Sequence, residues 1–214
     1  MWSVQIPKVP ARRLLLGTNN AGKVREFRAL LAGCGWELLA PADIGLSLEV
    51  EETGGTYDEN ARIKAAAFAA ASGLPALADD SGLEVDALNG EPGPLHHVND
   101  WDGRDQAHRI EILLRALKTI APVKRTCRYR AVVVVTFPDG SEIAGEGACE
   151  GLIVDEPRGA NGFGYDPVFF LPALGRTMAE LSFEEKNEVS HRARAAAAVK
   201  SRLGELSVRP GEAP

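Results

Sequence analysis

Residues 13–35, RLLLGTNNAGKVREFRALLAGCG, decide how the fold begins. The apolar run at 13–16 is typical of a buried strand, and 23–35 have the spacing of an amphipathic helix. Between them, GTNNAGKV (17–24) matches the phosphate-binding pattern G-x-x-x-x-G-K and departs from it at Val24, where Ser or Thr would bind Mg²⁺. The stretch therefore predicts a strand-loop-helix unit. Its loop is either a tight connection or a phosphate loop whose metal is held elsewhere.

Strand and helix patterns alternate along the rest of the chain. The predicted elements are a strand at 36–41, an Ala-rich helix over 57–72, a strand within 75–88 that ends at Asp-Ser-Gly, a helix over 104–120, a hairpin over 127–154 that turns at Pro-Asp-Gly, and helices that follow a Gly-rich loop at 159–167 and end near Leu206. This order predicts an α/β fold in which a mixed central sheet is flanked by helices.

Length, composition and charge limit the classes of protein to consider. The 214 residues are 45% apolar, so they can bury a core, and we expect one domain over 1–214 with flexible segments at 1–12 and 207–214. A net charge of -6 argues against a nucleic-acid partner, and no run approaches the roughly 18 apolar residues of a membrane span. The three cysteines lack metal-ligand spacing, which favours free thiols and a cytoplasmic location.

The opening loop carries groups that suit phosphate. Thr18, Asn20, Lys23 and the backbone amides lie near a predicted helix N-terminus, where the helix dipole favours an anion. Phosphate chemistry also needs carboxylates for a metal and a group that orients water. Because Val24 cannot bind a metal, those carboxylates must come from another part of the chain.

Two acidic pairs are candidates for that role. Neighbouring side chains on a strand point to opposite faces, so only one of Asp79 and Asp80 can enter a cleft, and the other has a structural role. The second pair, Glu51 and Glu52, precedes a Gly-Gly turn and a helix start; the alternative interpretation is a solvated acidic loop. In that helix Lys64 lies one turn from Asn60, either as a surface pair or as support for the site.

A third group of residues lies in the C-terminal third. Phe163, between two glycines, offers a ring on which a base could stack, or it is a core aromatic beside a turn. Lys186, His191 and Arg192 could be a solvated helix face. In one continuous helix, at about 100° per residue, they cannot converge. Ser190 is a favourable N-cap. If the helix breaks there and a new helix begins at His191, then His191 and Arg192 would point out of a helix N-terminus.

Five segments in this order make the chain similar to a known family. They are TNNAGK (18–23), EETGGTYDENARIKA (51–65), ADDSGLEVDALNG (78–90), GFGYDPVF (162–169) and AEL followed by EEKNEVSHR within 179–192. The chain resembles the inosine/xanthosine triphosphate pyrophosphatases, which remove deaminated purine nucleotides from the precursor pool. The resemblance extends from Leu14 to about Leu203.

The resemblance implies a role for each matching residue. Asp80 would bind Mg²⁺ together with Glu51 and would activate the attacking water. The residues expected to bind the purine nucleoside triphosphate are Thr18, Asn19, Asn20, Ala21, Gly22 and Lys23 for the phosphates, Ser81 beside the substrate, Phe163, Gly164, Tyr165 and Asp166 for the base, and Lys186, His191 and Arg192 for phosphate and the purine edge.

The resemblance also implies a reaction and an assembly. Water would attack the α-phosphorus of ITP, dITP or XTP and release the nucleoside monophosphate and pyrophosphate. The implied fold is a long mixed sheet between two lobes, with the active-site cleft between them, and the implied assembly is a homodimer. As donors, His191 and Arg192 would favour a 6-oxo purine over adenine. Guanine is also a 6-oxo purine, and the sequence does not show how it is rejected.

One segment departs from the family. Where many relatives have Ser-Ala-Arg-Tyr, this chain has PLHHVNDWDGRD (94–105), and the change leaves open any cleft or dimer contact made there. A polar surface loop is favoured there over a metal site, because the spacing follows no ligand pattern. The possible ligands are His96, His97, Asp100, Asp102 and His108. Two other functions stay open: a P-loop-like NTPase that releases orthophosphate, and a nucleotide sensor without turnover.

Overall fold

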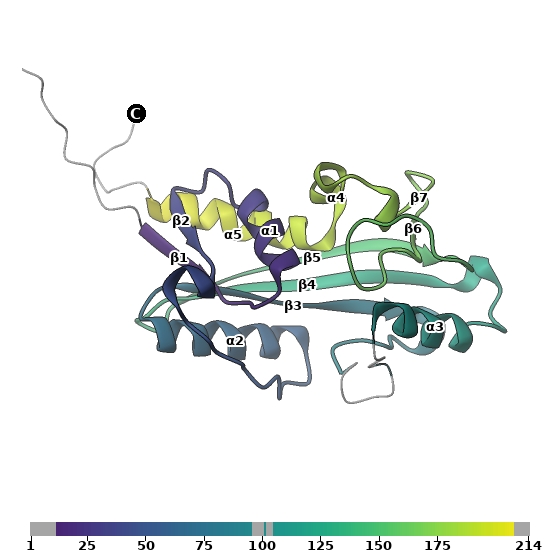
Figure 1. Cartoon of the computed structure of the whole chain (residues 1–214), viewed down its shortest axis with the longest axis horizontal. Coiled ribbons are helices and arrows are strands. Elements are labelled where there is room, and N and C mark those ends of the chain that lie inside the picture. The colour runs from purple at the N-terminus through teal and green to yellow at the C-terminus, as the bar shows by residue number, and fades with distance from the viewer. Residues whose placement is uncertain (1–11, 96–100, 102–104, 208–214) are drawn as a thin grey trace, which may run out of the picture.

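The computed structural model describes residues 12–95, 101 and 105–207, and a seven-stranded mixed sheet runs through it (Figure 1). In spatial order the strands are β2 (Trp36–Leu39), β1 (Arg12–Leu16), β3 (Ala76–Val85), β4 (Thr126–Thr136), β5 (Glu142–Ile153), β6 (Phe169–Leu171) and β7 (Arg176–Thr177). β1 pairs in parallel with β2 and β3, and every other pairing is antiparallel. The predicted α/β fold with a mixed central sheet is confirmed.

Helices cover both faces of this sheet. The α-helices are α1 (Ala21–Leu30), α2 (Tyr57–Ser72), α3 (Gln106–Ala116), α4 (Phe183–Val189) and α5 (His191–Ser207). The short 3-10 helices are η1 (Pro41–Ile44), η2 (Asp86–Leu88), η3 (Pro122–Lys124) and η4 (Met178–Glu180). α1, α4 and α5 lie on one side of the sheet and α2 lies on the other (Figure 1). α5 packs on β4 and β5, and α2 packs on β3 and β4.

The alternation of side chains along the second half of β4 contributes to two separate buried clusters. Val133 and Val135 face α1 and α5 and pack in one cluster with Phe27 and Val199. Val132 and Val134 face α2 and pack with Ala61 and Ala65. Because both faces of the sheet are covered, the strand reads as a continuous apolar run in the sequence. The sheet thus separates the two halves of the protein.

Most predicted elements are confirmed, and the end of one strand is corrected. The strand that was expected to end at Asp-Ser-Gly continues through it to Val85. Its backbone pairs with β4 at each position there, including Asp79 with Val133 and Ser81 with Ala131. The long partner strand therefore overrides the local turn signal. The helix expected over 104–120 is shorter, and the helix over 57–72 has the expected bounds.

The predicted helix break before His191 is confirmed. α4 ends at Val189, and Ser190 has an extended backbone, with φ -70° and ψ 156°. The Ser190 Oγ accepts a hydrogen bond from the Ala193 N–H at 3.2 Å, as an N-cap does. α5 consequently begins at His191, and its first turn points toward β3.

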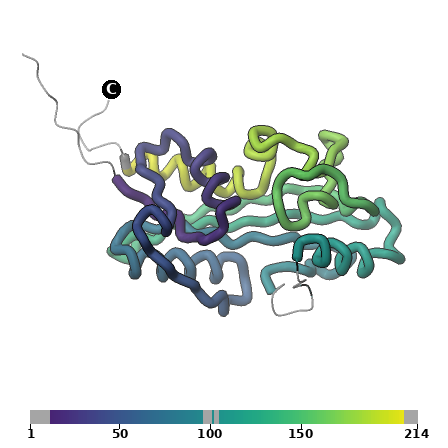
Figure 2. The backbone as a smooth tube through the Cα atoms, viewed as in Figure 1, coloured from purple at the N-terminus to yellow at the C-terminus, as the bar shows by residue number. Residues whose placement is uncertain are grey.

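The two ends of the described chain meet at the same end of the molecule (Figure 2). The Trp36 indole N–H donates to the Leu203 carbonyl at 3.0 Å and joins β2 to the end of α5. The predicted flexible segments lie almost wholly outside the described residues; Arg12 is the first residue of β1 and Ser207 is the last of α5. Within the described ranges, no helix has both the length and the apolarity to cross a membrane.

Candidate active site

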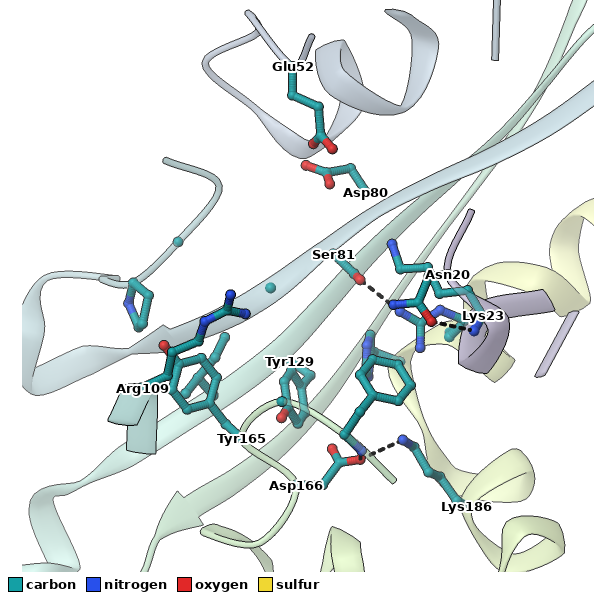
Figure 3. Close-up of a pocket in the computed structure, with 18 of the residues that line it drawn as sticks. Asn20, Lys23, Glu52, Asp80, Ser81, Arg109, Tyr129, Tyr165, Asp166 and Lys186 are labelled. Carbon is teal, nitrogen blue, oxygen red and sulfur yellow. Dashed lines mark hydrogen bonds and ion pairs between the residues drawn. The ribbon is translucent and has the colours of Figure 1, made fainter. Parts of the chain in front are cut away.

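A cavity of about 280 Å³ lies at the edge of β3 (Figure 3). β1 pairs with β3 only at Ala76 and Leu77, so the strand edge beyond these residues is not covered by β1. Both faces of β3 therefore contribute to the cavity: Asp80 from one face and Ser81 from the other. A second cavity of about 440 Å³ shares four of its lining residues, namely Asn20, Lys23, Glu52 and Lys64. The two cavities form one continuous site.

The N-terminus of α1 forms one wall of this site. The Asn20 Oδ1 accepts the Lys23 backbone N–H at 3.1 Å and caps the helix, and the Thr18 Oγ1 accepts the Asn20 N–H at 3.2 Å. The Asn19 side chain donates to the Leu48 carbonyl at 2.9 Å and ties the loop to the next segment. Val24 is partly buried, packs against the core cluster that contains residues of α5, and lines neither cavity. The loop thus presents backbone amides and a lysine, and no metal ligand at position 24.

Asp79 lies on the α5 side of β3 inside a buried ion-pair network. Its side chain is 1% exposed, and its two oxygens pair with Lys23 Nζ at 2.9 Å and with Arg192 Nε at 3.1 Å. Burial alone would raise the pKa of Asp79, but the two cations outweigh burial and hold the pKa well below its usual range. Burial lowers the pKa of Lys23, and Asp79 offsets part of that effect. Asp79 thus pairs with two cations, and it also lines the second cavity. The expectation that only one of the two aspartates enters a cleft is therefore wrong, because the edge of β3 beyond Leu77 is not covered by β1 and both faces of the strand border the site.

Asp80 lies on the α2 side and faces a second carboxylate. Figure 3 shows the carboxylate groups of Glu52 and Asp80 pointing toward each other. Lys64 Nζ lies 3.0 Å from an oxygen of each, and the Asn60 side-chain N–H₂ lies 3.4 Å from Asp80. Burial raises the pKa of Asp80 to about 6, with a further contribution from the charge of Glu52, although Lys64 acts in the opposite direction. One lysine thus pairs with two carboxylates and offsets only one of their charges.

Glu52, and not Glu51, is the acidic residue of its pair that reaches the cavity. Glu51 is exposed and lines neither cavity. Carboxylate oxygens are the ligands that Mg²⁺ prefers, usually one or two of them together with substrate phosphates. Glu52 and Asp80 match that donor set, and the Lys64 ammonium between them marks a position that favours a cation.

Cations surround an aromatic ring at the other end of the cavity. Lys186 Nζ lies 4.5 Å from the centroid of Phe163, and Arg192 Cζ lies 5.5 Å from it. The Asp166 carboxylate accepts the Phe163 N–H at 2.9 Å and Lys186 Nζ at 2.6 Å, which fixes the loop against α4. Two cationic donors therefore lie over this aromatic ring.

Glu26 of α1 ties the cations together, and sequence reasoning missed it. Its oxygens lie 3.1 Å from Lys186 Nζ and 2.6 Å from Arg192 Nη1. Arg192 is 1% exposed, and its Nη2 donates to the Ser81 Oγ at 2.8 Å. The signal was present in the sequence, because Glu26 follows Lys23 by three residues and so lies on the same face of the helix. The choice of partners depends on α4 and α5, which lie far along the chain.

His191 is held by ring stacking. Its imidazole stacks on Tyr129 with centroids 4.7 Å apart and planes at 20°, and Tyr129 stacks in turn on Phe169. Burial, together with the neighbouring Arg192 and Lys186, holds the pKa of His191 well below its usual range, so the ring is neutral. Among the described residues its Nδ1 has no hydrogen-bond partner.

The structure brings most of the predicted site residues together. Those that line the first cavity are Asn20, Lys23, Asp80, Ser81, Phe163, Gly164, Tyr165, Asp166, Lys186, His191 and Arg192. Thr18 and Asn19 line the second cavity. Ala21 and Gly22 line neither, although a Cβ at Gly22 would lie 3.4 Å from the Phe163 ring. The predicted phosphate and base regions are therefore contiguous.

Several residues of the cavity carried no functional prediction. Arg109 of α3 and Tyr129 of β4 line it, and so does Lys64, which the sequence left as a surface pair or a support. A strand or helix pattern does not indicate that such residues line a cavity, because they lie on separate elements that meet only in the folded protein. His96, His97, Asp100 and Asp102 lie outside the described residues, and no group of three or more metal-ligating side chains occurs among those that are described.

Comparisons with known proteins match most of the chain. The model of the Ham1 family matches residues 14–202. The dITP/XTP pyrophosphatase of Symbiobacterium thermophilum is 50% identical over 198 residues, which are 91% of this chain and 96% of that protein. A dITP/XTP pyrophosphatase of Thermus thermophilus is 48% identical over 183 residues, 86% of this chain and 87% of that protein.

Two solved structures extend the similarity to the fold. A HAM1 protein from Coxiella burnetii has a TM-score of 0.81 and 37% identity, over 91% of this chain and 99% of that one. The Ham1 protein of Staphylococcus aureus has a TM-score of 0.79 and 35% identity, over 91% of this chain and 100% of that one. The similarity thus covers the same sheet and helices that form the cavity.

Proposed function

Since the chain belongs to the Ham1 family, we propose that it hydrolyses noncanonical purine nucleoside triphosphates such as dITP and XTP. It is an enzyme, a nucleoside triphosphate pyrophosphatase, that acts in purine nucleotide metabolism. The products are the nucleoside monophosphate and pyrophosphate. The observation that carries the assignment of the site is one cavity that joins a helix N-terminus, a carboxylate pair and an aromatic ring bordered by cations.

The base belongs at the ring end of the cavity. A purine stacked on Phe163 has Lys186 and Arg192 at its edge, and both side chains only donate hydrogen bonds. A 6-oxo group accepts such bonds, whereas the 6-amino group of adenine is a donor and leaves the cations without a partner. This difference favours hypoxanthine and xanthine over adenine.

The phosphates belong at the N-terminus of α1 and in the second cavity. Backbone amides of the opening loop, the helix dipole and Lys23 all favour a polyanion there. Lys23 pairs with Asp79 in this structure at 2.9 Å. Its four-carbon stem allows the ammonium to turn toward phosphate while Arg192 keeps Asp79 paired.

Asp80 is the residue that we propose to hold and deprotonate the attacking water. In the metal-free site burial raises the pKa of Asp80 to about 6, so its carboxylate is ionised at neutral pH and has oxygens that can accept a proton at Oδ1 or Oδ2. Lys64 holds this carboxylate at 3.0 Å, and Glu52 lies across from it. We propose that Glu52 and Asp80 hold Mg²⁺, which would offset the charge of the phosphates when bound.

Val24 weighs against the alternative of a P-loop NTPase. The side chain of Val24 packs in the core, and the carboxylate pair lies across the cavity from α1. A hydroxyl at this position would therefore have no metal to bind. The loop is a phosphate loop whose proposed metal ligands come from other segments.

The assembly and location are also proposals. We propose a homodimer in the cytoplasm that acts on small nucleotides and not on nucleic acid or membranes, with residues 12–207 as one catalytic domain. The resemblance and the net charge of -6 support these points. Light scattering after size-exclusion chromatography measures the assembly, and a monomeric mass would contradict the dimer.

The function is tested by a substrate panel with product identification. ITP, dITP and XTP should be hydrolysed to monophosphate and pyrophosphate when Mg²⁺ is supplied, with ATP and GTP far poorer. Phosphorus NMR separates pyrophosphate from orthophosphate and so separates this reaction from that of a P-loop NTPase. Equal specificity constants for ITP and ATP, or orthophosphate as the first product, would contradict the proposal.

A further inference from the structure

Two glycines on β5 lie beneath the first turns of α5. Gly145 and Gly147 are two residues apart, so they face the same side of the sheet. They pair with Val133 and Ala131 of β4, whose side chains face α5. At these two positions the backbone of the helix approaches the backbone of the strand with no side chain between them.

The approach at Gly147 leaves no room for a methyl group. A Cβ there would lie 2.3 Å from the His191 carbonyl oxygen and 2.6 Å from the Ala195 nitrogen, and both are backbone atoms of α5. Non-bonded heavy atoms prefer separations of roughly 3.5 Å or more, so the helix start would have to move by about 1 Å. At Gly145 the obstacle is the Ala195 carbonyl oxygen, at 2.4 Å, and the Ala198 Cβ at 3.1 Å. Both glycines bring α5 close to the strand, but only Gly147 meets the turn that begins at His191.

That first turn carries Arg192, one of the two donors assigned to the purine, and His191, which lines the same cavity. The His191 ring stacks on Tyr129 at 4.7 Å, and Arg192 bonds to Asp79 at 3.1 Å and to Glu26 at 2.6 Å. These contacts come from three different elements of the structure: β4, β3 and α1. A helix that rises off β5 cannot keep all of them, because stacking and hydrogen bonding both depend on distances of a few ångströms.

We propose that Gly147 is a positioning residue for purine recognition, because its lack of a side chain seats the first turn of α5 on β5 and so places His191 and Arg192 at the purine edge. The inference rests on the proposed function. It concerns the discrimination between purines, and the hydrolysis step at Asp80 lies on the opposite face of β3.

The matched variants are Gly147→Ala and Gly145→Ala. Both add one methyl group to the same face of the same strand, and both press on the backbone of α5. The measurements are the specificity constants for ITP and ATP and the unfolding temperature of each protein. Both variants should unfold at a lower temperature. Gly147→Ala should lower the preference for ITP over ATP by about tenfold or more, whereas Gly145→Ala should keep it within about threefold.

Three results would overturn the inference or its premise, and they differ. A folded Gly147→Ala protein with the wild-type ITP preference contradicts the positioning role. An equal loss of preference in both variants shows that general packing of α5 is responsible, and also contradicts it. A wild-type protein without any ITP preference contradicts the proposed function instead.

A second variant keeps the test open if Gly147→Ala does not fold. Ala195→Val enlarges a fully buried side chain on α5, at the residue whose backbone nitrogen lies against Gly147. The preference for ITP should fall in this variant too. If this variant kept the preference for ITP over ATP and unfolded at a lower temperature, the role proposed for the contact between Gly147 and α5 would be contradicted.

Discussion

The two faces of β3 use the same residue type in opposite ways. Asp79 is enclosed by Lys23 and Arg192, and its side chain is 1% exposed. Asp80, the next residue, shares Lys64 with Glu52 and lines the cavity. The pKa of Asp79 is lowered and that of Asp80 is raised to about 6. Burial acts on both, so the neighbouring charges decide the direction: two cations pair with Asp79, whereas Asp80 shares one lysine with the carboxylate of Glu52.

This difference predicts that the two aspartates serve different properties. A carboxylate held by two cations is ionised at every physiological pH and is too weak a base to deprotonate water. A carboxylate with a pKa near neutrality can accept a proton in a reaction. We therefore expect the Asp79 face to determine stability and the Asp80 face to determine the rate.

Asp80→Asn should have the largest effect. The amide keeps the size of the side chain and loses both charge and basicity, so turnover of ITP should fall roughly 10⁴-fold, or about 5.5 kcal/mol of barrier. Binding of ITP should stay measurable, because the base and the α1 loop contribute their contacts without Asp80. Single-turnover hydrolysis and ITP titration separate the two quantities. Near-normal pyrophosphate release would remove Asp80 from the chemistry.

Asp79→Asn should mainly reduce stability. It leaves the largely buried Lys23 without its carboxylate and leaves the buried Arg192 with Glu26 alone, and the loss of one partner from a buried ion pair costs about 3 kcal/mol or more. Urea unfolding measures this change. The control is Asp58→Asn, which breaks the exposed pair with Arg62 and should cost less than about 1 kcal/mol. Equal costs for the two variants would contradict the comparison of the two faces.

The same variant has a pH signature. The folded-state pKa of Asp79 lies below its unfolded value of roughly 4, so its contribution is complete above that pH and is lost as the pH falls. Wild-type stability should therefore decline more steeply on acidification than that of Asp79→Asn. If the stabilities of the two proteins declined in parallel below about pH 5, the pKa of Asp79 would not be lowered in the folded protein.

Glu52→Gln should have an intermediate effect on rate, and Glu51→Gln provides its matched control. The first change removes a carboxylate that faces Asp80, so turnover should fall about 10- to 100-fold. The Mg²⁺ concentration that gives half of the maximal rate should rise. The second alters an exposed residue and should stay within about threefold of wild type. The Mg²⁺ dependence of initial rates measures both. The reverse ranking would restore Glu51 as the metal ligand that the resemblance implied.

Val24→Thr should have the smallest effect and tests the α1 side of the site. Because position 24 packs in the core, the added hydroxyl should cost about 1 kcal/mol of stability and leave pyrophosphate release within about tenfold. Phosphorus NMR of the products with ATP should detect no new orthophosphate-releasing activity. Orthophosphate release would show that a metal can be held beside α1 after all.

Local signals explain which parts of this structure could be predicted. Periodicity located the helices and strands, and the N-cap preference of Ser190 located the break that starts α5 at His191. The alternation of side chains along a strand placed Asp79 and Asp80 on opposite faces. The hairpin turn at Pro-Asp-Gly and the helix over 57–72 followed from the same kind of local rule. The functional roles of the individual residues stay predictions.

The parts that could not be predicted depend on partners distant in the chain. The turn signal at Asp-Ser-Gly failed because β4 pairs with every residue of that stretch. The pairing of Glu26 with Arg192 joins residues that are 166 positions apart, and no local pattern encodes it. Arg109 reaches the cavity only because α3 packs near the end of β3.

The sequence by itself determined the order of the elements, the family and the set of residue types that meet in the site, because these follow from local periodicity and short motifs. The tertiary structure alone decided that Glu52, and not Glu51, reaches the cavity, and in which direction the pKa of each aspartate is shifted. Glu52 faces Asp80 and Glu51 does not, because Lys64 of α2 pairs with Glu52 and with Asp80. Charge states depend on distances and burial across packed elements, and no single segment contains that information.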